Sequence, residues 1–199
     1  MPKVAVVPKL KIMVASTIYG FQDQLEQICS VLQTFGYEVW NSHFKTIPVN
    51  PGLSNQENCM EAVKACDIFF GVIRPQYGAI VDGGISITHH EMRKALELRK
   101  PRWFVAHRDI MVARQLLKQY MYDANDVPIP NFSYKKTAVL DSVKVIELYN
   151  ETILQALPPA DRIGHWVDEY TGLGDILKCL ETQLGDESRV RKIVSQRNP

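Results

Sequence analysis

The sequence lacks any apolar run close to the roughly 20 residues that a membrane-spanning helix needs. Its N-terminal VAVV segment is too short for the apolar region of a secretory signal. The four cysteines stand apart, without a CxxC pair or a regular spacing, and so indicate reduced, mostly buried thiols. We therefore expect a cytoplasmic protein with no membrane partner.

An excess of charge of one sign is also missing. The 199 residues include 23 Lys and Arg against 22 Asp and Glu, so no general basic field attracts a polyanion, and binding to nucleic acid is disfavoured. A P-loop and a GxGxxG fingerprint are both absent, which removes the main support for a Walker-type NTPase or an ordinary Rossmann dehydrogenase. No cofactor is expected.

Short apolar segments alternate with stretches of helical periodicity. Strands are predicted at residues 10–15, 37–40, 68–73 and 103–106, and helices at 21–35, 54–65, 88–99 and 111–122. A fifth strand at 143–146, followed by a helix, is preferred over one long helix capped by Asp141. The tail from 164 to 195 has a helical pattern, interrupted by glycines. This alternation is typical of a doubly wound parallel sheet, here an α/β domain of four to five strands over residues 1–158 with a helical C-terminal extension over 159–199 packed on it.

Parallel sheets bind ligands at the carboxyl ends of their strands, where helix N-termini point their amides outward. The loops at this edge supply the candidate ligand-binding residues Ser16, Thr17, Tyr19, Ser42, Arg74, Tyr77, Gly78 and Thr88. An arginine after a buried strand can bind a phosphate bidentately, although a solvated arginine at a strand end is an equally good interpretation. Serine and threonine at such bends more often make local caps.

Glu91 is the candidate catalytic residue. It stands three residues after Thr88, so it is expected in the first turn of a helix that faces the ligand edge. A carboxylate there could stabilise or attack an oxocarbenium-like ribosyl centre. Thr-x-x-Glu is also a capping box, in which the glutamate bonds back to the N-cap amide. The neighbouring His89 and His90 point about 100° apart on a helix, which disfavours a metal site with Glu91.

The motifs resemble a known superfamily. The segments Lys11–Thr17 and Cys66–Ile73, together with Thr88-x-x-Glu91, resemble the nucleoside 2-deoxyribosyltransferase-like superfamily, which is related in fold to TIR domains. Within it, the sequence looks most like an uncharacterised bacterial domain family that occurs in proteins of defence or signalling. The resemblance implies a flavodoxin-like sheet with the first strand in its interior.

The same resemblance implies cleavage of a nucleoside or NAD N-glycosidic bond by Glu91. Arg74 and Ile85 stand where the transferases carry aspartates, and Asp82 is out of register, so a phosphorylated ligand fits better than a free deoxynucleoside. Two hypotheses remain: a hydrolase, namely an N-glycosidase of a nucleotide or NAD-like ligand, and a non-catalytic module of the same fold. The module would bind a nucleotide signal or a protein partner, with Glu91 as a cap. A homo-oligomer is compatible with either hypothesis.

Overall fold

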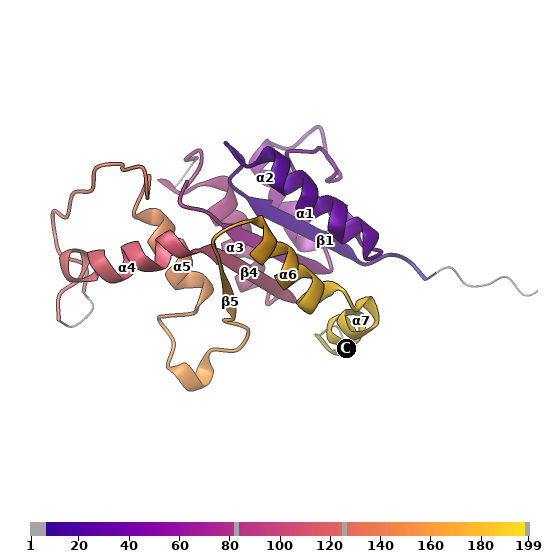
Figure 1. The fold of residues 1–199 in the computed structure, drawn as a ribbon. Helices are drawn as coiled ribbons and strands as arrows, with labels where there is room; N and C mark the ends of the chain where they lie inside the picture. The colour runs from indigo at the N-terminus through magenta and orange to yellow at the C-terminus, as the bar shows by residue number, and fades with distance from the viewer. Residues whose placement is uncertain (1–6, 82–83, 125–126, 198–199) are drawn as a thin grey trace, which may run out of the picture.

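A five-stranded parallel sheet forms the centre of the fold (Figure 1). The computed structural model describes residues 7–81, 84–124 and 127–197. The strands are β1 (Lys11–Ser16), β2 (Glu38–Trp40), β3 (Ile68–Ile73), β4 (Arg102–His107) and β5 (Val167–Tyr170). Their order is β2-β1-β3-β4-β5, and all neighbouring pairs are parallel. This is the flavodoxin-like order, so the predicted fold class and the interior position of the first strand are confirmed.

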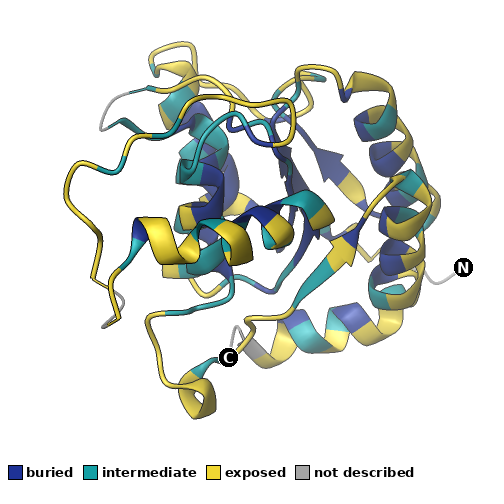
Figure 2. Ribbon diagram, turned by 60° about the vertical axis from the view of Figure 1, so that its left-hand side comes forward, coloured by how far each residue is buried: buried dark blue, intermediate teal, exposed yellow. Residues whose placement is uncertain are grey.

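Helices cover both faces of the sheet, which explains why the inner strands are continuous apolar runs. The helices are α1 (Gln22–Thr34), α2 (Asn55–Ala65), α3 (Ile87–Glu97), α4 (Arg108–Met121), α5 (Lys144–Thr152), α6 (Leu173–Leu184) and α7 (Glu187–Arg197), with a short 3₁₀ turn at Pro159–Asp161. All six residues of β3 are buried, and Figure 2 shows the inner strands as a buried centre, with exposed residues on the outer faces of the helices. None of the helices among the described residues is long and apolar enough to cross a membrane.

Two separate cores result, one on each face. The first core lies under α2, α3, α4 and α5 and includes Met13 and Phe69. The second lies under α1, α6 and α7 and includes Ile12 and Phe70. Successive residues of a strand point to opposite faces, so neighbours such as Phe69 and Phe70 belong to different cores.

The fifth strand is not where the sequence predicted it. Residues 143–146 do not form a strand: they belong to the start of α5, whose N-cap position is Val143. Four apolar-rich residues fit a buried helix as well as a strand, and periodicity alone could not separate the two. The alternative of a helix is right for residues 144–152, but Asp141 is not its cap: the N-cap is Val143, and Asp141 Oδ1 accepts a hydrogen bond from the Tyr77 amide at 2.8 Å instead.

The C-terminal tail, for which the sequence predicts a helical pattern, is not wholly helical. It supplies β5, which pairs with β4 from Phe104↔Val167 to His107↔Tyr170, and then α6 and α7. The strand and its two helices share the sheet and the second core with the rest of the chain. The division at residue 158 stays a prediction, but the segment after it completes the same sheet.

Three helices end in the same hydrogen-bonded turn. Helix α1 is followed by Gly36, which has φ +99° and was predicted as the residue after the helix. Helices α3 and α5 place Arg99 (φ +49°) and Leu154 (φ +53°) at the corresponding position. The Arg99 and Lys100 amides donate to Leu96 and Ala95, which is the Schellman pattern. Glycine is the usual residue there, because a Cβ is disfavoured in the left-handed region.

Candidate functional site

Arg74 joins the loops that follow β1 and β3. Its Nη1 donates hydrogen bonds to the carbonyl oxygens of Thr17 (2.8 Å) and Tyr19 (2.9 Å). Its guanidinium lies over the Phe21 ring, 4.6 Å from the centroid, on the α1 side of the sheet. Burial lowers the pKa of Arg74, yet the group keeps its positive charge. Arg74 therefore points toward the loop after β1, as phosphate binding would require, while it uses two of its donors to order that loop.

The loops after β1 and β3 also touch directly. Gly78 has φ +87°, and a Cβ at this position would lie 3.2 Å from both Cγ2 and Oγ1 of Thr17. The Ser16 hydroxyl donates to the Thr17 carbonyl oxygen at 3.2 Å. The Tyr19 side chain is 84% exposed and stands in solvent. Ser16, Thr17 and Gly78 are thus brought together at the predicted edge, and the Tyr19 side chain is not.

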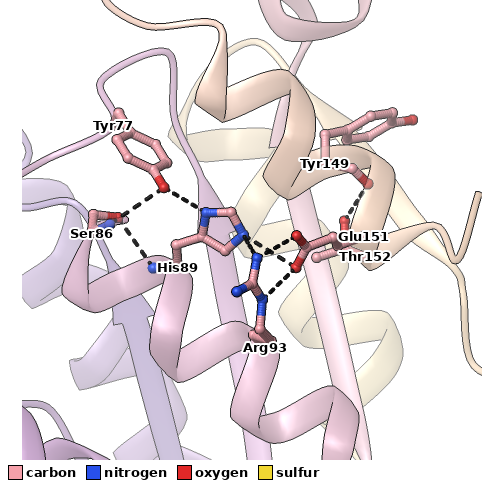
Figure 3. A network of polar contacts seen from close by, with 7 residues as sticks. All are labelled: Tyr77, Ser86, His89, Arg93, Tyr149, Glu151 and Thr152. Atoms are coloured by element: carbon pink, nitrogen blue, oxygen red, sulfur yellow. Dashed lines mark hydrogen bonds and ion pairs between the residues drawn. The ribbon is translucent and has the colours of Figure 1, made fainter. Parts of the chain in front are cut away.

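Tyr77 lies in a buried polar network that ties α3 to α5 (Figure 3). Its hydroxyl is 2.6 Å from His89 Nδ1, and it accepts a hydrogen bond from the Ser86 amide at 3.3 Å. The other ring nitrogen of His89 is 3.1 Å from Glu151 Oε2, and Arg93 donates to both oxygens of Glu151 at 2.6 and 3.0 Å. The Tyr77 hydroxyl is therefore engaged inside the protein.

The electrostatics of this network keep Glu151 ionised. Burial alone would raise the pKa of Glu151, but hydrogen bonds from His89 and Arg93, together with their charges, lower it to about 2. The His89 side chain is fully buried between this carboxylate and Tyr77. Within the described residues, no group of three or more His, Cys, Asp or Glu side chains could hold a metal ion.

The N-cap of helix α3 lies two residues before Thr88. Ser86 is its N-cap, and the Ser86 hydroxyl accepts a hydrogen bond from the His89 amide at 3.2 Å. Thr88 is therefore the second helical residue, and Glu91 lies beyond the reach of the N-cap amide. The capping-box interpretation of Thr88-x-x-Glu91 is wrong. Residues 88 and 91 share one face of the helix, so Thr88 lies one turn closer than Glu91 to the carboxyl edge of the sheet.

Glu91 carries an unusual carboxyl group. Its side chain is only 3% exposed, and the Cys59 thiol on α2 lies beside it. One carboxyl oxygen, Oε1, has no hydrogen-bond partner in the described part of the chain. Burial raises the pKa of Glu91 to about 7, and the Cys59 hydrogen bond lowers it only in part. Near neutral pH this carboxyl can thus either hold or release a proton, as acid–base and nucleophilic catalysis require.

Cys59 links Glu91 to the loop after β2. Ser42 also lies close enough to Cys59 to act on the pKa of its thiol, so the three side chains come from a loop and two helices. Burial raises the pKa of Cys59 to about 12, so its thiol is protonated and donates. Ser42 and Glu91 are predicted site residues, and Cys59 is not. The available signal was weak: Cys59, Ala62 and Val63 recur on one face of α2, without an indication that α3 covers that face.

The predicted residues fall into two groups on either side of the sheet. Ser42 and Glu91 belong to the side of α2 and α3, where the first core lies. Arg74 lies over Phe21, on the side of the second core. Thr17 and Gly78 lie together in the loops after β1 and β3, at the carboxyl end of the sheet that both groups share. A single ligand that touched Arg74 and Glu91 would cross the carboxyl ends of β1 and β3.

Two solved structures are similar to this chain at low sequence identity. A structure of the CMP N-glycosidase BcmB from Clostridium botulinum is 14% identical, with a TM-score of 0.48, over 87% of this chain and 99% of that one. A 2-deoxyribosyltransferase from Leishmania mexicana is 13% identical, with a TM-score of 0.39, over 72% of this chain and 97% of that one. Likenesses with TM-scores this low do not identify an activity.

No curated protein matches the sequence. A family model does match it: the model described as domain of unknown function (DUF4062) aligns with residues 11–152, from the first residue of β1 to the last residue of α5. That match spans well over half of the chain, and the protein therefore belongs to the DUF4062 family.

Proposed function

We propose that the protein is an N-glycosidase that hydrolyses a nucleotide or NAD-like ligand, with Glu91 as its catalytic carboxylate. One observation carries this proposal. A carboxyl group is buried under the carboxyl edge of the sheet, with the Cys59 thiol beside it and with Oε1 lacking a partner among the described residues. A buried polar atom without a partner costs stability, so its presence in a native site calls for a functional explanation.

In the proposed reaction the ionised Glu91 carboxylate faces C1′ of the ribose. The C1′–N bond breaks and its electron pair leaves with the base, while the carboxylate stabilises the oxocarbenium ion or bonds to C1′. Water then adds its hydroxyl to C1′, and its proton passes to the leaving base or, where the base leaves already neutral as nicotinamide does, to solvent. The products are the free base and the remaining ribosyl phosphate. The neighbouring Cys59 thiol can donate a hydrogen bond to the carboxylate and so orient it. Because Glu91 is 3% exposed, the loops at this edge must move apart when substrate enters.

Arg74 supports a phosphorylated substrate. Its Nη1 is engaged by two carbonyl oxygens, whereas Nε and Nη2 have no hydrogen-bond partner among the described residues. These two groups can bind a phosphate in the bidentate arrangement that arginine favours. With the phosphate on Arg74 and the ribose near Glu91, the ligand would lie over the ends of β1 and β3, beside Thr17 and Gly78.

The second candidate is a non-catalytic module that binds a nucleotide signal or a protein partner at the same edge. It is favoured by the nearly complete burial of Glu91 and by the engagement of the Tyr77 hydroxyl with His89 and Ser86. In such a module Glu91 would contact no ligand.

The test is release of free base from a panel of nucleosides, nucleotides and NAD, followed by chromatography. Glu91→Gln should lower turnover by roughly two to three orders of magnitude, because glutamine cannot supply the negative charge. The matched control is Glu97→Gln, at the exposed end of the same helix, which should keep wild-type turnover. Retained turnover in Glu91→Gln would remove Glu91 from the mechanism. If the wild type releases no base but binds a nucleotide in calorimetry, the protein is the binding module.

A further inference from the structure

Three polar side chains stand in a row across the carboxyl edge of the sheet. The parallel register pairs His107 of β4 with Tyr170 of β5, and it pairs Ile73 of β3 with Ala106 of β4. Arg74 follows Ile73 and is therefore level with His107. Arg74, His107 and Tyr170 thus occupy one row over three neighbouring strands. Because such strands lie about 4.8 Å apart, the row is about 10 Å long. Helices α4 and α6 begin beside it (Figure 1).

The three side chains lie on one face of the sheet, that of the second core. Tyr170 belongs to this core, and Arg74 lies over the ring of Phe21, which belongs to it as well. The His107 ring meets the Tyr170 ring edge to face, with the centroids 5.1 Å apart. Burial raises the pKa of Tyr170, and the positive charge of Arg74 opposes that rise, so the two groups are close enough to interact. The row is therefore a cluster.

Each member of the row has a hydrogen-bond donor that the described part of the chain does not use. Tyr170 is 4% exposed, and a tyrosine hydroxyl so deeply placed usually finds a partner, yet this one has none among the described residues. His107 Nδ1 accepts a hydrogen bond from the Asp109 amide at 3.2 Å, so the neutral ring carries its proton on Nε2. That Nε2 is likewise without a partner there, as are Nε and Nη2 of Arg74. These donors can all bind one anion.

The charges around the row favour an anion at these donors. Arg74 supplies a full positive charge, and the N-terminus of α4, whose N-cap is His107, adds the positive end of a 14-residue helix dipole. Two carboxylates act on the row from behind. Asp109 Oδ2 lies 3.5 Å from Nδ1 of His107, not from its Nε2, and the charge of Asp141 acts on Arg74. Neither carboxylate accepts a hydrogen bond from the unused donors.

We propose that the substrate carries a diphosphate, with its first phosphate on Arg74 and its second phosphate on His107 and Tyr170. His107 Nε2 and the Tyr170 hydroxyl donate hydrogen bonds to the second phosphate. This inference rests on the proposed function, in which Arg74 binds a phosphate while Glu91 faces the ribose. It narrows the substrate class to nucleoside diphosphates and NAD-like dinucleotides and excludes nucleoside monophosphates. The ligand would then extend from the ends of β1 and β3 to those of β4 and β5.

Calorimetry of the full chain with inorganic pyrophosphate and inorganic phosphate tests the proposal. Pyrophosphate should bind at least about tenfold more tightly than phosphate. Equal affinities would overturn the second phosphate site and leave the proposed N-glycosidase standing for a nucleoside monophosphate. Absence of binding by both anions would overturn the phosphate role of Arg74 as well. Neither anion contains a glycosidic bond, so this result does not depend on catalysis by Glu91, which base release tests separately.

Pyrophosphate also carries more charge than phosphate, so two variants are needed to assign its preference to the row. Tyr170→Phe removes only a hydroxyl that no described residue bonds, and His107→Asn removes the ring but keeps an N-cap acceptor for α4. Each variant should bind pyrophosphate at least about fivefold more weakly, with phosphate affinity and melting temperature nearly unchanged.

The matched control is His165→Asn, an exposed histidine before the amino end of β5, which should bind both anions like the wild type. Wild-type pyrophosphate affinity in Tyr170→Phe or His107→Asn, or an equal loss in His165→Asn, would refute the assignment of the second phosphate to this row.

Discussion

Replacing Glu91 by glutamine should remove a loss of folding stability that the wild type suffers as pH rises. Burial raises the pKa of Glu91 from 4.5 to about 7. Between these values the folded protein keeps a proton that the unfolded chain has released. The free energy of unfolding of the wild type must therefore fall as pH rises through this window. Above pH 7 the folded state holds a charged carboxylate in its core. Glutamine has nearly the same shape and no charge, so the variant does not suffer this loss.

The size of the effect follows from the two pKa values. The gap between 4.5 and about 7 corresponds to about 3 kcal/mol, because one pKa unit corresponds to about 1.4 kcal/mol. The stability of Glu91→Gln relative to the wild type should rise by this amount from pH 4 to pH 8. For a chain of this size the melting temperatures should then diverge by roughly 6–12 °C. A hydrogen bond that the glutamine amide fails to make would lower the stability of the variant equally at every pH. It would not change how the stability depends on pH.

The assay is urea unfolding followed by tryptophan fluorescence at steps from about pH 4 to pH 8. Glu97→Gln, on the exposed side of the same helix, serves as the control and should follow the wild type throughout. Parallel stability curves for Glu91→Gln and the wild type would show that Glu91 has an ordinary pKa. Burial would then not have raised the pKa of the Glu91 carboxyl toward neutral.

Three further predictions concern the scaffold. Gly71→Ala should destabilise the protein by about 1–3 kcal/mol in urea unfolding, because the new Cβ would lie 2.5 Å from the Phe104 ring; a neutral effect would mean that the ring moves freely. Glu151→Gln should cost about 1–2 kcal/mol at pH 7, allowing for the one-third exposure of the side chain. This difference should vanish as pH falls from 4.5 toward 2, because a lowered carboxyl pKa stabilises only above that range; a constant difference would contradict the pKa of about 2. Arg74→Met keeps a long side chain but removes both hydrogen bonds to the carbonyl oxygens of Thr17 and Tyr19, so hydrogen exchange should speed up at residues 17–20, and unchanged exchange would show that Arg74 does not order this loop.

The inner strands could be predicted because burial on both faces leaves a direct mark in the sequence. The runs IMVA in β1 and IFFGVI in β3 are continuous apolar segments, and such runs occur in parallel strands that helices cover on both sides. Strand β5 could not be found in this way. It is a short edge strand with the sequence VDEY, and its polar residues suit an exposed edge but resemble the surrounding helical pattern. The segment 143–146 resembles a strand in sequence because it is short and apolar-rich, although it begins α5.

The candidate site was predictable in its position but not in its partners. The sequence indicates which loops end at the carboxyl edge, and so it selects Ser42 and Glu91. It does not indicate that α2 packs against α3, and the link through Cys59 depends on that packing. The same reason explains Tyr77, which was expected to face a ligand. Its hydroxyl instead contacts His89 on α3, within a network that continues to α5.

The late position of β5 has a consequence for how the chain is made. Strand β4 ends at His107, and its outer edge gains a partner only when Val167 has been synthesised, about 60 residues later. At about 5–20 residues per second this leaves an unpaired strand for roughly 3–12 s. Helices α6 and α7, which cover the second core, follow later still. A chain shortened to residues 11–152 would keep that edge and core open permanently, and it should aggregate on expression instead of folding.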